Sequence, residues 1–140
     1  MENLEATQAL QQAAHLQGRA RSASRWYTRY LVVYGVVSFV FASLFGVVGN
    51  RWGAAVLTPL WAVFVALLSA WSFRKKTAIL GFGRLHGIVI GAWAVLWGIT
   101  VLVGSNRYQG QLGWWVAGGA AMALPCFVGA VVAHRRTAVE

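Results

Sequence analysis

The chain has 140 residues, of which 59% are hydrophobic and 11% charged, and Lys plus Arg outnumber Asp plus Glu by 12 to 3. A water-soluble domain usually carries about 25% charged residues, so a chain with less than half of that share must turn much of its surface toward something apolar. The composition therefore excludes an ordinary soluble domain and predicts a single integral membrane domain. The net charge of +9 is a feature of proteins that bind nucleic acid. Whether nucleic acid is a partner depends on where the charges lie, which is described below.

Residues 1–29 are polar and basic, unlike the rest of the chain. A stripe of small and apolar residues recurs there at helical spacing, and Asn3 can cap its start; it comprises Ala6, Ala9, Leu10, Ala13, Leu16 and Ala20. The pattern predicts a short cytoplasmic helix lying at the membrane surface, continued by an arginine-rich run from Arg19 to Arg29. A docking arm for a protein partner fits the pattern equally well.

Four apolar runs follow, each long enough to cross a bilayer, which takes about 20 residues. They cover about residues 30–49, 53–73, 87–104 and 112–133, and none contains a charged residue. Lipid offers no hydrogen-bond partner to the backbone, so each run must be a helix. The sequence predicts an all-α polytopic membrane protein, with two helical hairpins forming a compact bundle over residues 30–136 and a short tail at 137–140.

The basic residues lie in alternate connections between these runs, and their distribution predicts the orientation. Arg51 and Arg107 stand in the two short turns, whereas the other ten stand before the first run, between the second and third, and after the fourth. These ten are Arg19, Arg21, Arg25, Arg29, Arg74, Lys75, Lys76, Arg84, Arg135 and Arg136. We expect both termini to be cytoplasmic and the last eight to form a basic rim that binds anionic lipid headgroups. Charges dispersed along an interface do not favour nucleic acid as a partner.

Small residues recur along each run, and helices in lipid approach closely through such residues. The residues that we expect at helix contacts are Gly35, Gly46, Gly87, Gly91, Gly98, Gly113, Ala117, Ala121 and Gly129. Larger aliphatic residues would then face lipid. Alternatively, one stripe, with that of the fourth run favoured, is the interface of a dimer.

The chain also contains an internal similarity. A shift of 56 positions superposes Asn50 and Arg51 on Asn106 and Arg107, and a shift of 60 superposes residues 75–78 on 135–138. Two hairpins in the same membrane orientation are therefore expected. Duplication of one hairpin explains the match, but basic residues after a span are expected in any case, and Pro59 and Pro125 do not superpose.

Residues that carry chemistry are scarce within the runs. The acidic residues are Glu2, Glu5 and Glu140, all near the ends, so no buried carboxylate is available for proton antiport. Small multidrug-resistance transporters share the length and the four spans but carry a glutamate in their first helix, which is missing between Tyr30 and Gly49. His86 and His134 could together ligate haem or a metal, but interfacial residues are the simpler interpretation. We expect no enzyme activity, cofactor or metal.

Aromatic residues fall into two groups. Those near the ends of the runs are typical of interfacial belts; they include Trp26, Tyr27, Tyr30, Trp71 and Phe73 at the inner interface and Trp52, Tyr108, Trp114 and Trp115 at the outer interface. Trp61, Trp93 and Trp97 fall well inside the runs. They either fill space opposite glycine-rich helices or wall a pocket for a lipid tail or a quinone.

The stretch from Arg25 to Tyr34, together with the aromatic second run around Pro59-Leu60-Trp61, resembles the bacterial two-helix membrane domain that follows an arginine-rich lead-in. The resemblance covers residues 19–76, with a degenerate second copy behind, and implies a small bacterial inner-membrane protein. The resemblance implies no particular activity. The function that the sequence favours is a non-enzymatic accessory, regulatory or interaction subunit, or a homo-oligomer. The alternative is a small carrier or channel for an apolar or uncharged solute, acting as a homo-oligomer.

Overall fold

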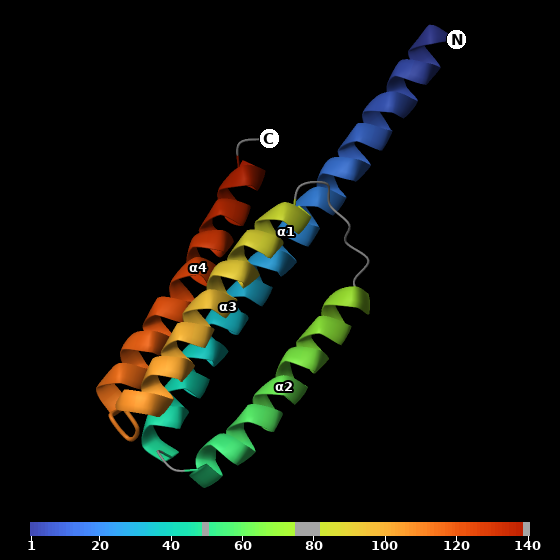
Figure 1. Cartoon of the computed structure of the whole chain (residues 1–140). Coiled ribbons are helices and arrows are strands. Elements are labelled where there is room, and N and C mark those ends of the chain that lie inside the picture. The colour runs from blue at the N-terminus through green and yellow to red at the C-terminus, as the bar shows by residue number, and fades with distance from the viewer. Residues whose placement is uncertain (49–50, 75–81, 139–140) are drawn as a thin grey trace.

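The computed structural model describes residues 1–48, 51–74 and 82–138, with side chains at all of these except 2, 20, 51–54, 69, 72–74, 82 and 136–138. The described chain is all-α. Its helices are α1 (Glu2–Val48), α2 (Arg51–Arg74), α3 (Phe82–Arg107) and α4 (Leu112–Ala138). They alternate in direction, so both termini lie toward one end and the short turns at the other (Figure 1).

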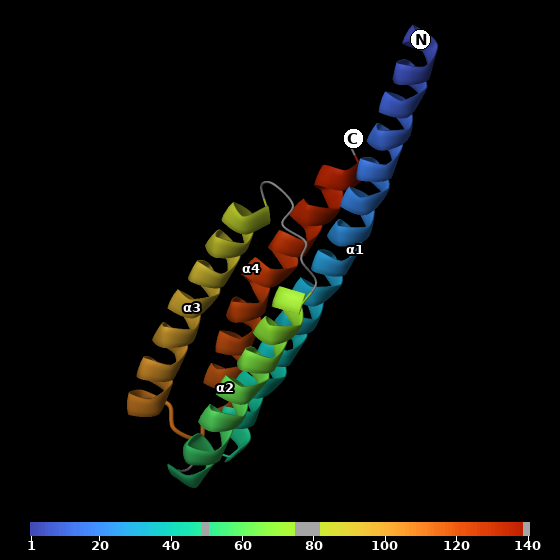
Figure 2. The same cartoon turned by 90° about the vertical axis from the view of Figure 1, so that its right-hand side faces the viewer.

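Helix α1 is a single element of 47 residues, whereas the sequence predicts a separate surface helix and a span. Nothing in its sequence ends a helix at the boundary: residues 2–29 contain no proline and are rich in Ala, Gln, Leu and Arg, which favour the helix. Gly18 is the one glycine of that stretch, and a Cβ atom built on it would meet nothing within 4 Å apart from its chain neighbours and its own helix backbone. The expected surface helix is therefore coaxial with the first span, and it extends past the ends of the other helices (Figures 1 and 2).

The most extensive packing in the fold is between α1 and α4, and small residues make it possible. A Cβ atom built on Gly119 would lie 3.0 Å from the Ala42 Cβ and 3.1 Å from the Phe39 carbonyl oxygen. Gly46 and Gly35 are as tightly placed, since a Cβ on them would lie 2.9 Å from Trp115 and 3.1 Å from Cys126. Without side chains at these points the two backbones approach closely, which is how helices associate in lipid.

Only part of the expected small-residue stripes takes part in this packing. Gly35, Gly46 and Gly129 lie at helix contacts, and Gly129 touches both Val89 of α3 and Leu31 of α1. In contrast, nothing lies within 4 Å of a Cβ built on Gly87, Gly91, Gly98 or Gly113. Ala117 is exposed and Ala121 is half-buried. These differences have one cause, which is that the stripe on α3 and the outer half of the stripe on α4 face away from the other helices.

Helices α3 and α4 form a tight hairpin. Residues 108–111 connect them, and Gly110 has a φ of 74°, a conformation that glycine adopts without strain. Close to the turn, Gly104 leaves room for Trp114 and Trp115, and farther along Gly118 lies against Thr100. Gly104 and Gly118 were not among the contact residues expected from the sequence, because they lie outside the stripes with regular spacing.

Helix α2 stands apart from the other three, contrary to the expected compact bundle (Figure 1). Its backbone approaches α1 over a short stretch, and Trp61 provides much of the connection by reaching Tyr34 and Phe41 of α1. The α1–α2 hairpin is thus more open than the α3–α4 hairpin. The two halves that the sequence superposes therefore pack differently: Gly35 is in a tight contact, whereas Gly91, which the shift of 56 positions superposes on it, is not.

Three of the helices contain described segments long and apolar enough to cross a membrane: Asn3–Val48, Gly83–Arg107 and Leu112–Arg135. In α2 the apolar segment of described residues is Ala55–Leu68, which is shorter. Aliphatic side chains cover the outside of the helices, among them Val36, Leu67 and Val95. These features are those of a membrane protein.

The glycine contact predicts an asymmetric response to one and the same substitution. We expect Gly119→Leu to destabilise the protein by about 1–3 kcal/mol, because the new side chain would overpack against Phe39 and Ala42. Gly91→Leu is the control. It brings the same gain in helix propensity as Gly119→Leu, but its new side chain meets open space. Thermal unfolding in detergent measures the difference, and equal stability of the two variants would contradict the α1–α4 contact.

Candidate functional site

The candidate site is a column of aromatic rings between α1, α2 and α3. On α1, Tyr27, Tyr30 and Tyr34 are three and four residues apart and so share one face. Their rings stack in sequence, with centroids 6.2 and 6.1 Å apart. Tyr30 and Tyr34 are buried, and Tyr27 is half-buried. This aromatic face of α1 is directed at α2 and α3, while the small-residue face is directed at α4.

Three tryptophans form the centre of the column. The Trp61 ring lies 5.8 Å from those of Trp93 and Trp97, which stack 5.9 Å apart with nearly parallel planes. Tyr34 of α1 meets Trp93 edge to face at 5.2 Å. Offset and edge-to-face pairs at such distances are favourable arrangements for aromatic rings. The tryptophans predicted to lie deep in the runs therefore contact one another and fill the space between three helices.

Two polar side chains at this depth, those of Trp93 and Ser38, are hydrogen-bonded to each other. The Trp93 indole N–H donates to the Ser38 hydroxyl oxygen at 3.1 Å, and the Ser38 hydroxyl donates to the Tyr34 carbonyl oxygen at 2.7 Å. Both side chains are buried, so each would be costly to leave without a partner. This relay joins α1 to α3 through a directional contact in addition to ring packing.

The column continues to the end of the bundle where the short turns lie. Phe45 stacks on Trp115 at 5.4 Å and meets Trp97 at 5.8 Å. The Trp115 N–H donates to the Tyr108 carbonyl oxygen, and the Trp114 N–H donates to the Thr100 carbonyl oxygen. These bonds anchor the α3–α4 turn, and they bury a ring that the sequence analysis assigned to an interfacial belt.

At the opposite end the column meets a histidine. The Tyr27 hydroxyl and His86 Nδ1 are hydrogen-bonded at 3.2 Å, which joins α1 to α3. Trp26 stacks on Tyr30 at 5.7 Å and meets Trp71 of α2 at 5.3 Å. Trp26, Tyr27 and Tyr30 thus pack against α2 and α3 at the end of the bundle where the sequence predicts the inner aromatic belt, because their side of α1 faces these two helices. Phe73 and Trp52 lie outside the described side chains.

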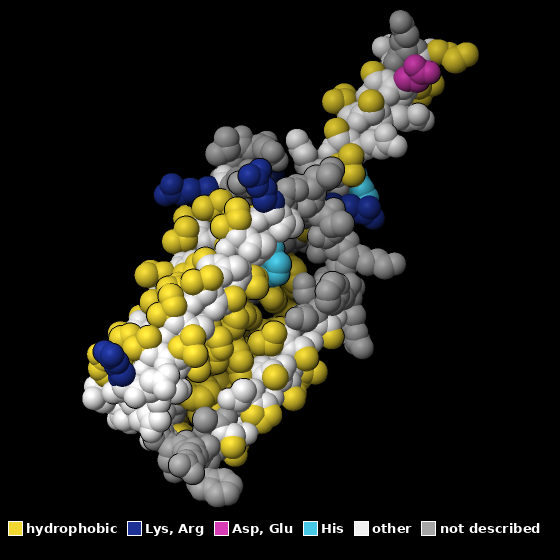
Figure 3. All heavy atoms as spheres, in the orientation of Figure 1, with side chains coloured by type: hydrophobic (Ala, Val, Ile, Leu, Met, Phe, Trp, Pro, Cys, Tyr) yellow, Lys and Arg dark blue, Asp and Glu magenta, His cyan; other side chains and the backbone are white. Residues whose placement is uncertain are grey.

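The basic side chains gather at this same end of the bundle (Figure 3). Arg25, Arg29, Arg84 and Arg135 are exposed there, as are Arg19 and Arg21 farther out on α1. Arg107 is exposed at the end of α3, near the α3–α4 turn at the other end. The remaining members of the expected basic rim, Arg74, Lys75, Lys76 and Arg136, have side chains outside the described part of the structure.

Groups that could hold a metal or form a nucleophilic centre are sparse. Among the described residues, no three His, Cys, Asp or Glu side chains lie close enough together to bind a metal ion. Cys126 is buried in the α1–α4 contact, where its thiol faces the Met122 carbonyl oxygen at 3.8 Å. His134 is exposed and His86 is half-buried against tyrosines.

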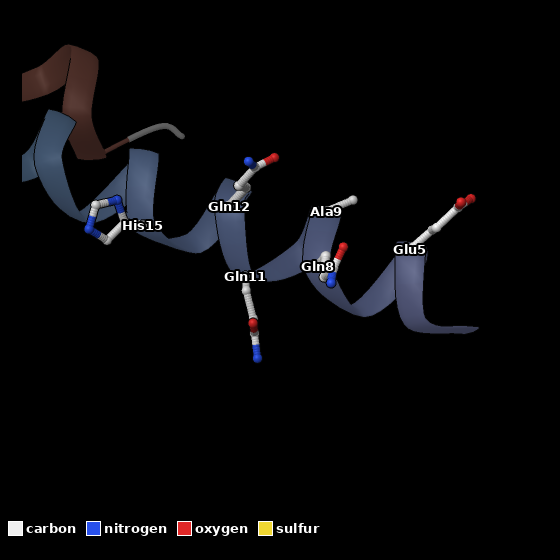
Figure 4. A pocket seen from close by; sticks show the side chains of 6 residues that line it. All are labelled: Glu5, Gln8, Ala9, Gln11, Gln12 and His15. Atoms are coloured by element: carbon white, nitrogen blue, oxygen red, sulfur yellow. The ribbon is translucent and has the colours of Figure 1, made fainter. Parts of the chain in front are cut away.

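A shallow hollow lies on the projecting part of α1 (Figure 4). It is lined by Glu5, Gln8, Ala9, Gln11, Gln12 and His15, all of one helix. Spacings of three, four and seven residues among them frame the kind of depression that a side chain of another helix occupies in helix packing. The hollow has no wall from a second element, so it is a surface feature rather than an enclosed ligand site.

No family model, curated protein or solved structure matches the chain. The assignment of function therefore rests on the geometry described above.

The Trp93–Ser38 relay predicts a measurable coupling between α1 and α3. In a double-mutant cycle, Trp93→Phe and Ser38→Ala should couple by about 1 kcal/mol, the usual net value of such a hydrogen bond. Ser43→Ala is the matched control, because the Ser43 hydroxyl donates only to the Phe39 carbonyl oxygen of its own helix. Unfolding free energies in detergent give both couplings, and no coupling at Ser38 would contradict the relay.

Proposed function

We propose that the chain is an integral protein of a bacterial inner membrane that crosses the bilayer four times, with both termini in the cytoplasm. The observation that carries the proposal is that apolar and basic side chains occupy separate parts of the outside of the bundle. Aliphatic side chains cover its length, and exposed arginines gather at the end that holds the termini. Basic residues flanking spans are retained on the cytoplasmic side, so this end is the inner one.

Helix α2 is the fourth span in this proposal. Its described apolar segment is short, but the run of about residues 53–73 contains no charged residue. Trp61 places α2 against α1 and α3 at the level of their own apolar segments. A helix held there by buried rings lies at the same depth as its neighbours and must cross with them.

We further propose that the protein acts through contacts rather than through a reaction, as an accessory, regulatory or interaction subunit. The described interior supports this, because Tyr34, Trp61, Trp93 and Trp97 are engaged with one another. The surfaces left over are external: the face of α3 that carries Gly87 and Gly91, the projecting part of α1, and the basic rim. Among the described side chains, no observation specifically favours the carrier alternative.

The basic rim is proposed to hold anionic lipid headgroups. Arg25 and Arg29 are four residues apart on one face of α1. Arg84 lies near the start of α3 and Arg135 near the end of α4, and both are at the same end of the bundle. Each basic side chain near an anionic leaflet contributes about 1 kcal/mol of attraction. Such contacts would fix the depth of the bundle in the membrane.

The proposal predicts that the protein does not occur alone. After brief cross-linking in native membranes and purification in mild detergent, we expect a stoichiometric assembly, either with a partner or of several copies. Mass spectrometry identifies the proteins, and the mass of the complex gives their number. Recovery of the chain without a partner protein, as a monomer or as a homo-oligomer, together with solute transport into proteoliposomes, would contradict a contact role.

The same preparation tests the basic rim through the lipids that co-purify. We expect the Arg84→Gln, Arg135→Gln double variant to retain clearly less anionic lipid than the parent protein, because two cationic partners of the headgroups are removed. Arg107→Gln is the matched control, since Arg107 is exposed at the other end. Equal loss in the control would contradict a rim that selects lipid at one end.

A further inference from the structure

Helices α2 and α3 leave a gap between them that side chains fill only in part. Their backbones do not approach closely anywhere in the described chain, and a hollow lined with hydrophobic side chains lies between them (Figure 3). The Trp61 ring crosses the gap and lies 5.8 Å from the rings of Trp93 and Trp97. These tryptophans close the hollow halfway along the two helices. We call the half that runs from there toward the end holding the termini the α2–α3 groove.

The walls of the α2–α3 groove are apolar. Leu68 follows Trp61 by seven residues and so shares its face of α2. Ile90 lies four residues after His86 and three before Trp93, on the face of α3 that carries both. Leu68 and Ile90 pack against the core but are only partly buried. From His86 to Trp93 a helix rises about 10 Å, which gives the length of the groove along α3.

The open end of the groove carries a hydrogen-bond donor without a partner. His86 Nδ1 is hydrogen-bonded to the Tyr27 hydroxyl at 3.2 Å, and with Tyr27 as the donor the neutral ring carries its proton on Nε2. Among the described residues Nε2 has no hydrogen-bond partner, and it is not enclosed, because the enclosed atoms without partners belong to Trp26 and Thr28. An N–H group beside an apolar groove gains from an acceptor that a ligand brings.

The end of the bundle where the groove opens is also basic. Arg84 is exposed two residues before His86, and Arg25 and Arg29 are exposed on α1 at the same end. Glu5 is the only acidic residue whose side chain the structure describes, and it lies far out on the projecting part of α1. The arginines therefore have no acidic side chain beside them in the described structure, and an anionic group from outside the chain would complement them.

We propose that the α2–α3 groove holds one acyl chain of an anionic phospholipid. The headgroup lies among the arginines, and an ester or phosphate oxygen accepts a hydrogen bond from His86 Nε2. A single hydrocarbon chain fits beside the tryptophans, whereas a further helix, about 10 Å across, would have to displace Trp61. A quinone would place its tail in the groove but would leave the arginines without an anion.

The inference rests on the proposed function, because the groove must lie within the bilayer to take up an acyl chain. The phospholipid is then a structural ligand of the bundle. It covers the apolar walls at the place where α2 and α3 have no close backbone contact, and so it joins the loosely held α2 to the rest of the fold.

Native mass spectrometry tests the groove in the full-length protein. The protein is reconstituted in vesicles of equal parts phosphatidylglycerol and phosphatidylcholine and is then extracted in mild detergent. We expect one tightly held phosphatidylglycerol per chain. Ile90→Trp fills the groove and should reduce this occupancy several-fold, whereas Val95→Trp, its matched control at an exposed position of α3, should leave it unchanged. Equal occupancy in both variants, or no tightly held lipid in the parent protein, would overturn the proposal.

A second pair of variants separates a filled groove from a disturbed α3. Leu68→Trp fills the groove from α2, and Leu67→Trp at the exposed neighbouring position is its control. We expect the same contrast in lipid occupancy, with circular dichroism in detergent to establish that each variant is folded. His86→Phe should also lower the occupancy several-fold, because it removes the donor, whereas His134→Phe at the same end should not.

Purification from native membranes decides between the occupants. One quinone per chain in place of the phospholipid would contradict the proposal, and so would equal retention of phosphatidylcholine and phosphatidylglycerol from the mixed vesicles. If the Arg84→Gln, Arg135→Gln variant loses anionic lipid but Ile90→Trp does not, the groove inference fails and the basic rim stands. If α2 does not cross the membrane, the proposed function fails first.

Discussion

The fold depends on the close contact of α1 with α4, which small residues make possible. Gly119, Gly46 and Gly35 leave no space for a side chain, so the two helices meet almost backbone to backbone. Between helices in lipid the hydrophobic effect provides little attraction, and dispersion across such a contact has to provide it instead. The rotation of α1 that brings its small residues to α4 also fixes what its other faces meet: tyrosines toward α2 and α3, and valines outward.

On the side of α1 that faces away from α4, helices α2 and α3 are far apart, and this distance explains why the bundle is rich in tryptophan. Helix α2 is not in close backbone contact with α3, so only large rings can bridge the distance, and Trp61 reaches Trp93 and Trp97 there. Indole N–H groups in an apolar interior need acceptors, and Ser38 supplies one at the centre. Tight packing on one side and ring packing on the other leave the outer face of α3 and the projecting part of α1 without packing contacts among the described residues.

The sequence predicts the helices well because apolar runs and charged breaks have a direct physical meaning in a membrane. It predicts the rotation of each helix poorly. Regular small-residue spacing selected Gly87 and Gly91, which face open space, and missed Gly118 and Gly119, because spacing shows which residues share a face but not what that face meets. Likewise Trp26 and Tyr30 stand at the height of an interfacial belt, but their direction depends on α2 and α3. In the proposed topology, the boundary at residue 30 marks a change of surroundings from water to lipid, which one continuous helix can cross.

The central claim is that four helices cross the membrane with the basic end inside. Reporter fusions after Gly49, Arg74 and Arg136 test it most directly, because they place a probe after the first, second and fourth spans. The proposed topology predicts an external signal at Gly49 and cytoplasmic signals at Arg74 and Arg136. An external signal at Arg74 would show that α2 does not return across the membrane, and it would contradict both the topology and the assignment of the basic rim.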